Sequence, residues 1–236
     1  MAAENQLLLN KRWRHYKEPA LLAASAGAID TISFITLFGL FTAHVTGNLV
    51  VAGASLAGEN EGIVIKLLVI PVFMISVAVT TLIIKTRKCI TPTFLAGLFM
   101  SEVLLLLLFA LLGYMWSPFA EPDGLTTLVT GMTGVMGMGV RNATSRLLLS
   151  ITSPSTMMTG NVTQLTIDII NYFQIPSTEN HTKLIKSGSS VIGFLAGAGL
   201  GTLGYILMGF FSVLIPVIMI VAVIYKEVSY VLIMRK

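Results

Sequence analysis

The segment that decides the fold is AHVTGN (Ala43–Asn48), which interrupts a strongly apolar part of the chain. A related segment, MMTGN (Met157–Asn161), lies between apolar runs much later in the sequence. Glycine and asparagine are poor residues for the interior of a helix. The two Thr-Gly-Asn elements therefore predict two places at which a helix is broken.

The composition indicates a membrane protein. Of the 236 residues, 55% are hydrophobic and only 11% are charged, whereas soluble domains carry about 25% charged residues. Windows of about 20 residues with almost no charge recur along the chain, as in membrane-spanning helices. The net charge is +4, but the basic residues cluster in short connections and form no basic domain. We therefore expect no nucleic acid as a partner. The expected partner is the lipid bilayer.

Hydropathy places six spans along the chain. They are expected at about Ala20–Phe41, Ile63–Ile84, Pro92–Tyr114, Leu125–Leu149, Ser187–Met208 and Phe210–Tyr225. The connections 58–62 and 115–124 contain no Lys or Arg, whereas the connection KTRK (Lys85–Lys88) and the region of Lys183 are basic. Because basic loops stay in the cytoplasm, this count predicts both termini on the cytoplasmic side of the inner membrane. A count of eight spans would place KTRK outside the cell.

The predicted organisation has five parts. They are a basic cytoplasmic tail (1–19), a first three-helix repeat (20–114), an external loop (115–124), a second three-helix repeat (125–225) and a cytoplasmic tail (226–236). Two apolar segments, Thr42–Ala57 and Pro154–Phe173, belong to none of the six spans, and each contains one Thr-Gly-Asn element. Interrupted apolar segments of this kind suit re-entrant or broken helices. Because each unit has three spans, the second unit enters the membrane from the opposite side and is inverted relative to the first. The predicted fold is therefore all-α, with six transmembrane helices in an inverted 3+3 repeat.

The stretches GAIDTISFITLFGLFTAHVTGNLVVAG (27–53) and RNATSRLLLSITSPSTMMTGNVTQL (141–165) resemble the YoaK-like family of bacterial multi-pass membrane proteins. The matching elements are Gly27, Asp30, His44–Asn48, Arg141–Ala143 and Thr159–Asn161. The resemblance covers the chain from about the first span to the last. It implies an integral membrane protein with a duplicated Thr-Gly-Asn element, and it implies no particular chemistry.

Ionisable residues inside spans cost about 2.5–3.5 kcal/mol each on insertion scales, and they commonly mark functional sites. Asp30 lies about 15 Å into the first span, near the bilayer midplane. Glu102 is equally deep in the third span, and Arg141 lies within the fourth. A purely structural alternative is that Asp30 or Glu102 neutralises Arg141 and holds the spans together.

The candidate residues for substrate binding or proton coupling are Asp30, His44, Thr46, Asn48, Arg141, Asn142, Thr159 and Asn161. Secondary candidates are Glu102, Arg146 and Asp168. Within each element, glycine permits close approach, asparagine both donates and accepts hydrogen bonds, and a half-helix N-terminus attracts anions. A structural alternative is that the threonines cap the half-helices while the asparagines satisfy broken backbone.

Two further patterns concern partners and chemistry. Glycines at 193, 197 and 201 and at 131, 134, 137 and 139 predict close helix packing and a possible homo-oligomer. Signatures of hydrolases, nucleotide-binding loops and metal-binding clusters are absent from the sequence, and Cys89 is the only cysteine. We therefore expect no enzyme activity, no cofactor and no metal site.

The leading hypothesis is a small secondary transporter, either a uniporter or proton-coupled. It would bind a small anionic or zwitterionic solute at the midplane between the repeats. The alternatives are a channel or lipid-handling protein of the same architecture, or a membrane subunit that transports nothing.

Overall fold

The computed structural model describes residues 16–57, 62–149 and 156–234, and within these ranges it contains helices and no strand. The α-helices are α2 (Glu18–Thr36), α3 (Val45–Ala57), α4 (Ile63–Lys85), α5 (Pro92–Trp116), α6 (Leu125–Leu148), α7 (Met158–Gln174), α8 (Thr178–Met208) and α9 (Leu214–Met234). A short 3-10 helix, η2 (Gly209–Val213), joins α8 to α9.

In the described part of the chain, four helical segments are long and apolar enough to cross a membrane. They are α2, α4, α5 and the continuous helical run Thr178–Ser229, which contains α8, η2 and part of α9. Large apolar side chains on α4 and α8, such as Met74, Leu82, Ile192 and Ile206, are more than 60% exposed. Such exposure suits contact with lipid rather than water.

Four boundaries differ from the sequence-based prediction, and one of them is the end of the last helix, which continues to Met234 rather than ending near Tyr225. Helix α2 ends at Thr36 rather than near Phe41, because Phe38 and Gly39 take positive φ values of 53° and 79° and turn the chain back. Gly39 adopts this conformation without steric cost. Helix α8 begins at Thr178 rather than Ser187, and its N-terminus is capped by the Ser177 side chain. The last helix, α9, begins at Leu214 rather than Phe210 because η2 precedes it.

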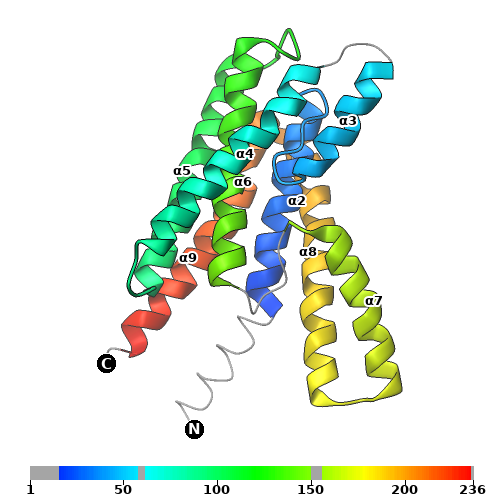
Figure 1. Cartoon of the computed structure of the whole chain (residues 1–236), viewed down its shortest axis with the longest axis vertical. Coiled ribbons are helices and arrows are strands. Elements are labelled where there is room, and N and C mark those ends of the chain that lie inside the picture. The colour runs from blue at the N-terminus through cyan, green and yellow to red at the C-terminus, as the bar shows by residue number, and fades with distance from the viewer. Residues whose placement is uncertain (1–15, 58–61, 150–155, 235–236) are drawn as a thin grey trace.

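Helices α3 and α7 are short, and both begin near the middle height of the molecule (Figure 1). From there α3 runs toward the upper end and α7 toward the lower end, while α2 begins and α9 ends at the lower end. Among the described elements, α3 packs only against α4 and α7 only against α8. The two Thr-Gly-Asn elements occupy the first turns of these two helices.

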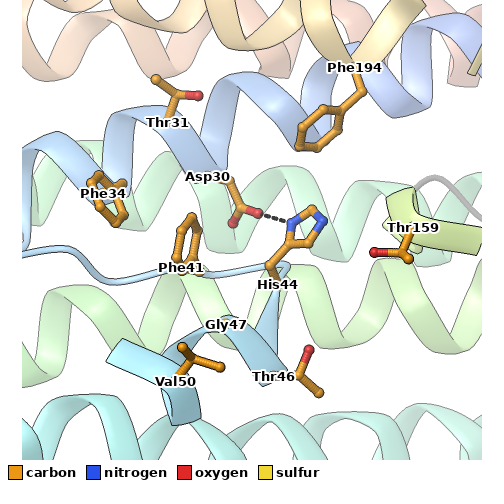
Figure 2. A pocket seen from close by; sticks show the side chains of 10 residues that line it. All are labelled: Asp30, Thr31, Phe34, Phe41, His44, Thr46, Gly47, Val50, Thr159 and Phe194. Atoms are coloured by element: carbon orange, nitrogen blue, oxygen red, sulfur yellow. Dashed lines mark hydrogen bonds and ion pairs between the residues drawn. The ribbon is translucent and has the colours of Figure 1, made fainter. Parts of the chain in front are cut away.

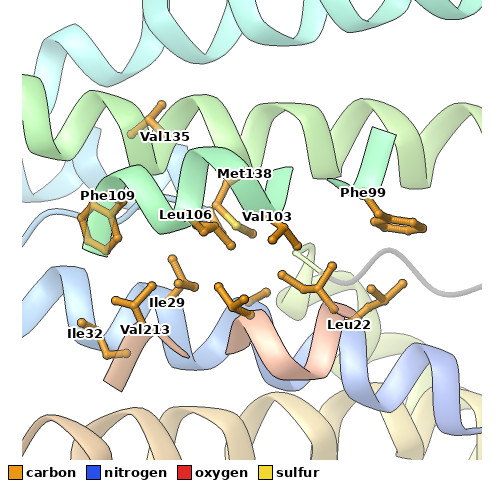
Figure 3. Close-up of a cluster of buried hydrophobic side chains, with 14 of the residues drawn as sticks. Leu22, Ile29, Ile32, Phe99, Val103, Leu106, Phe109, Val135, Met138 and Val213 are labelled. Atoms are coloured by element: carbon orange, nitrogen blue, oxygen red, sulfur yellow. The ribbon is translucent and has the colours of Figure 1, made fainter. Parts of the chain in front are cut away.

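The hydrophobic core lies among α2, α5, α6 and the η2–α9 segment (Figure 3). Ile29 and Ile32 of α2 belong to this cluster together with Leu106 and Phe109 of α5, and all four side chains are fully buried. The core therefore joins the first half of the chain to the second, and the central cavities described below lie beside it.

Helices α2 and α8 approach each other so closely that no side chain fits between them. A Cβ atom placed on Gly193, Gly197 or Gly201 of α8 would overlap the backbone of Ala20, Ala24 or Ala28 of α2. The glycines of α6 face other parts of the same chain, namely Leu40, Thr42, Leu105 and Ser76. Both glycine faces are thus covered within this chain at these positions, so these glycines do not support the expected homo-oligomer.

Candidate functional site

The segment that leads into α3 is anchored by Asp30, a carboxylate only 2% exposed to solvent. Its Oδ1 atom accepts hydrogen bonds from the Thr42 amide (2.8 Å), the Thr42 hydroxyl (3.0 Å) and the Ala43 amide (2.6 Å). Its Oδ2 atom lies 2.5 Å from Nδ1 of His44. Charge-assisted hydrogen bonds are stronger than neutral ones, so this carboxylate fixes both the segment Thr42–Ala43 and the imidazole.

Asn48 holds the same segment from the other side. Its Oδ1 atom accepts from the Phe41 amide (2.9 Å), and its Nδ2 group donates to the Phe41 carbonyl oxygen (2.7 Å). The asparagine of the first Thr-Gly-Asn element therefore satisfies broken backbone, which is the structural alternative derived above. Thr46 is the second residue of α3 and follows the helix start, so its position is not that of a cap.

Asn48→Asp should lower the free energy of unfolding by about 1–3 kcal/mol, because the partly buried Phe41 carbonyl loses its donor and faces a second acceptor. Unfolding by sodium dodecyl sulfate in mixed micelles would measure this change. Asn171→Asp, on the exposed part of α7, is the matched control and should stay within about 0.5 kcal/mol of the wild type. Equal stability of the two variants would contradict the anchoring role.

A cavity of about 600 Å³, called here the first cavity, lies where α2, α3, α7 and α8 approach one another (Figure 2). Its polar wall carries the Asp30–His44 pair, and the rings of Phe34, Phe41 and Phe194 form much of its apolar wall. The remaining lining residues are Thr31, Thr46, Gly47, Val50 and Thr159.

A second cavity of about 300 Å³ adjoins the first, and the two share His44, Thr46 and Thr159. Its other lining residues are Ala43, Val45, Phe73, Asn142, Thr156, Met157, Met158 and Gly160. Asn142 of α6 accepts a hydrogen bond at Oδ1 from the Thr156 hydroxyl (2.7 Å) and donates to the Met138 carbonyl (3.2 Å). Asn142 is thus held to the segment that leads into α7.

Arg141 lies outside the lining of both cavities and forms a fully buried ion pair with Glu102. The distances are 2.8 Å from Nε to Oε2 and 2.6 Å from Nη2 to Oε1. Its Nη1 atom also donates to the Leu22 carbonyl (2.9 Å) and the Ser25 hydroxyl (3.0 Å). Arg141 therefore joins α6 to α5 and α2, and Glu102 rather than Asp30 is its ion-pair partner.

The other sequence candidates lie away from the cavity walls. Asp168 of α7 accepts from Gln164 and from the Ser187 hydroxyl of α8, each at 2.8 Å, and so ties the two helices together. Arg146 is exposed, and its Nη1 atom lies 3.8 Å from the Met157 sulfur. Asn161 is buried in the first turn of α7. The structure thus gathers Asp30, His44, Thr46, Asn142 and Thr159 at the cavities.

Several residues at these sites carried no usable signal in the sequence. Phe34, Phe41 and Phe194 line the first cavity, but aromatic residues are commonplace in apolar sequence.

Lys66 did carry a signal, because it is a lone cation near the start of the second predicted span. It is 2% exposed and donates to the Ser55 hydroxyl of α3 at 3.3 Å.

Long apolar helices that surround polar-lined cavities at the start of two short helices define a multi-pass helical membrane protein. The chain belongs to the family described as "Protein of unknown function (DUF1275)", whose model matches residues 19–225. It is 27% identical over 152 residues to the UPF0700 transmembrane protein YoaK of Bacillus subtilis. That match covers 64% of this chain and 65% of the length of YoaK, and it confirms the resemblance drawn from the sequence. No solved structure matches the chain.

Proposed function

We propose that the protein is a small secondary transporter, not an enzyme, and that it binds a small solute in the first cavity. The observation that carries this proposal is the position of the buried Asp30–His44 pair, which lines a cavity beside the first turns of two short helices. Short helices that begin near mid-depth and face a common cavity are the typical binding architecture of secondary transporters.

The helix packing supports an inverted repeat of α2–α5 and α6–α9. Helix α2 packs on α8 as α6 packs on α4, α5 packs on α6 as α9 packs on α2, and α3 packs on α4 as α7 packs on α8. The opposite directions of α3 and α7 agree with this relation (Figure 1). We assign the lower end in Figure 1 to the cytoplasm, because the connection between α4 and α5 and the beginning of α8 lie there. These segments carry the basic residues Lys85–Lys88 and Lys183.

The chemistry of the first cavity favours a small anionic or zwitterionic solute with an apolar part. Helix N-termini carry partial positive charge, and Thr46 and Thr159, in the first turns of α3 and α7, line the cavity. Protonation of His44 cancels the negative charge of Asp30 beside it, so that an anion is no longer repelled there. Arg141 adds no net charge because Glu102 neutralises it. The phenyl rings provide a surface for the apolar part.

A second candidate is the handling of an amphipathic lipid. Phe34 and Val50 line the first cavity and are also 42% and 74% exposed, so this cavity borders the apolar surface of the protein. An acyl chain would then cover Phe34 and Val50, and the head group would bind beside His44.

Proton-coupled uptake by purified protein in proteoliposomes tests the transporter proposal, with pools of small organic acids and amino acids as substrates. Asp30→Asn should reduce uptake about tenfold or more, because it weakens charge-assisted hydrogen bonds at the cavity wall. Asp123→Asn makes the same chemical change in the loop before α6 and should leave uptake unchanged. Uptake should also rise as the outside pH falls from about 8 to 6, since histidine gains its charge in this range.

Unchanged uptake by Asp30→Asn would contradict the assignment of the site. Ion currents resolvable in planar bilayers would indicate a channel, and exchange of a fluorescent phospholipid without uptake of any soluble acid would favour the lipid candidate. No transport of either kind would leave the membrane-subunit alternative.

A further inference from the structure

Several lining residues of the two cavities correspond in pairs. Asp30 on α2 and Asn142 on α6 line one cavity each, and Thr46 and Thr159 line both. Phe194 of α8 lines the first cavity, and Phe73 of α4 lines the second. In the proposed repeat α2 corresponds to α6 and α8 to α4, so each pair occupies matching helices.

The hydrogen bonds of the two cavities match as well. Asp30 accepts from His44, and Asn142 accepts from Thr156, and both partners lie 14 residues further along the chain. Three residues before each acceptor stands a glycine, Gly27 or Gly139. A Cβ atom on Gly27 would meet the Phe194 carbonyl, and one on Gly139 would meet Ser76 and lie 3.4 Å from the Phe73 carbonyl. The correspondence therefore extends from the cavities into the packing of the helices behind them.

One difference separates the two cavities. In the first, the matched pair is Asp30 and His44, which are its only titratable lining residues among those that the structure describes. In the second, the matched pair is Asn142 and Thr156, neither of which binds or releases a proton near neutral pH. Apart from His44, which the two cavities share, the second cavity has no titratable lining residue in the described part of the chain.

We infer that the second cavity is a counterpart compartment for the same class of solute, on the opposite side of a path that narrows at His44, Thr46 and Thr159. This inference rests on the proposed transport function. The carboxamide of Asn142 and the hydroxyl of Thr156 bind the polar end of a small anionic or zwitterionic solute there without taking up a proton. The first cavity communicates with the outside and the second with the cytoplasm, because α3 and α7 run to opposite ends of the molecule.

Single cysteines test this inference, since Cys89 is the only native cysteine and Cys89→Ser removes it. The probes are 2-sulfonatoethyl methanethiosulfonate, an anion, and its trimethylammonium analogue, applied to right-side-out and inside-out vesicles. Thr31→Cys should react from the outside only, and Met157→Cys from the cytoplasmic side only. Leu195→Cys is the control, because Leu195 is 66% exposed on α8 but lines neither cavity and should stay unreactive in lipid.

A second arm tests Asn142 directly. Asn142→Asp should slow the anionic probe relative to the cationic probe about tenfold at Met157→Cys, because a like charge then shares the compartment. The same substitution should leave the ratio at Thr31→Cys unchanged. If Met157→Cys does not yield folded protein, Gly160→Cys replaces it, since an added Cβ at Gly160 has nothing within 4 Å.

Reaction of both cysteines from one side, or a Met157→Cys as unreactive as Leu195→Cys, would overturn the inference. An unchanged probe ratio in Asn142→Asp would do the same for the role of Asn142. None of these readouts requires uptake of a substrate. A failed uptake assay with the expected labelling would reject the transport proposal while the paired compartments stand, and the converse result would reject only the compartments.

Discussion

Arg141→Met should lower the free energy of unfolding by about 3–5 kcal/mol, because it leaves the Glu102 carboxylate buried without a counter-charge. Both side chains of this pair have no solvent exposure, so water cannot replace the lost partner. The substitution also removes the donors to the Leu22 carbonyl and the Ser25 hydroxyl. Titration with sodium dodecyl sulfate, followed by tryptophan fluorescence or far-UV circular dichroism, would measure the change.

The double variant Glu102→Leu with Arg141→Met is the control for this prediction. Replacing a buried ion pair by apolar residues of similar volume is often neutral or stabilising. The double variant should therefore recover most of the lost stability, and any uptake activity with it. If it is as unstable as Arg141→Met alone, the pair has a role beyond mutual neutralisation.

Gly197→Ala should separate α2 from α8 and lower the free energy of unfolding by about 3 kcal/mol or more. Overpacking usually costs 1–3 kcal/mol, and here the new methyl group would overlap the backbone of Ala24, which cannot rotate away. Gly199→Ala, two residues further on α8, is the matched control because its added Cβ has nothing within 4 Å. It should be neutral or stabilising by up to about 1 kcal/mol, since alanine favours helix more than glycine does.

The same micelle titration measures both glycine variants. Equal stability of Gly197→Ala and Gly199→Ala would show that α2 and α8 are not in backbone contact. A third variant, Gly193→Ala, should resemble Gly197→Ala because its Cβ would meet the backbone of Ala20.

Much of the helical framework could be predicted from hydropathy, because apolar length in a bilayer is a strong constraint. The early end of α2 could not be predicted, because it depends on a turn at Phe38 and Gly39. The Ser33 hydroxyl stabilises this turn by donating a hydrogen bond to the Leu40 carbonyl. In the site, the repeated Thr-Gly-Asn element drew attention to the first turns of α3 and α7, and Thr46 and Thr159 of these turns line both cavities. The partner of Arg141 did not follow from sequence, because Asp30 and Glu102 were equally plausible until the helices were placed beside one another.

The glycine and alanine contact between α2 and α8 also has a mechanical consequence. Where two helices are in backbone contact, no side chain lies between them that could slide or change rotamer. The two helices therefore move as a single rigid unit. This rigid pair carries Asp30 on α2 and Phe194 on α8. The Asp30 carboxylate binds the segment Thr42–His44 to it by hydrogen bonds. Asp30, His44 and Phe194 therefore keep their spacing in any motion of the protein. The first cavity can therefore change its volume only by movement of elements outside this rigid pair. These elements are α3, which packs on α4, and the start of α7 with Thr159.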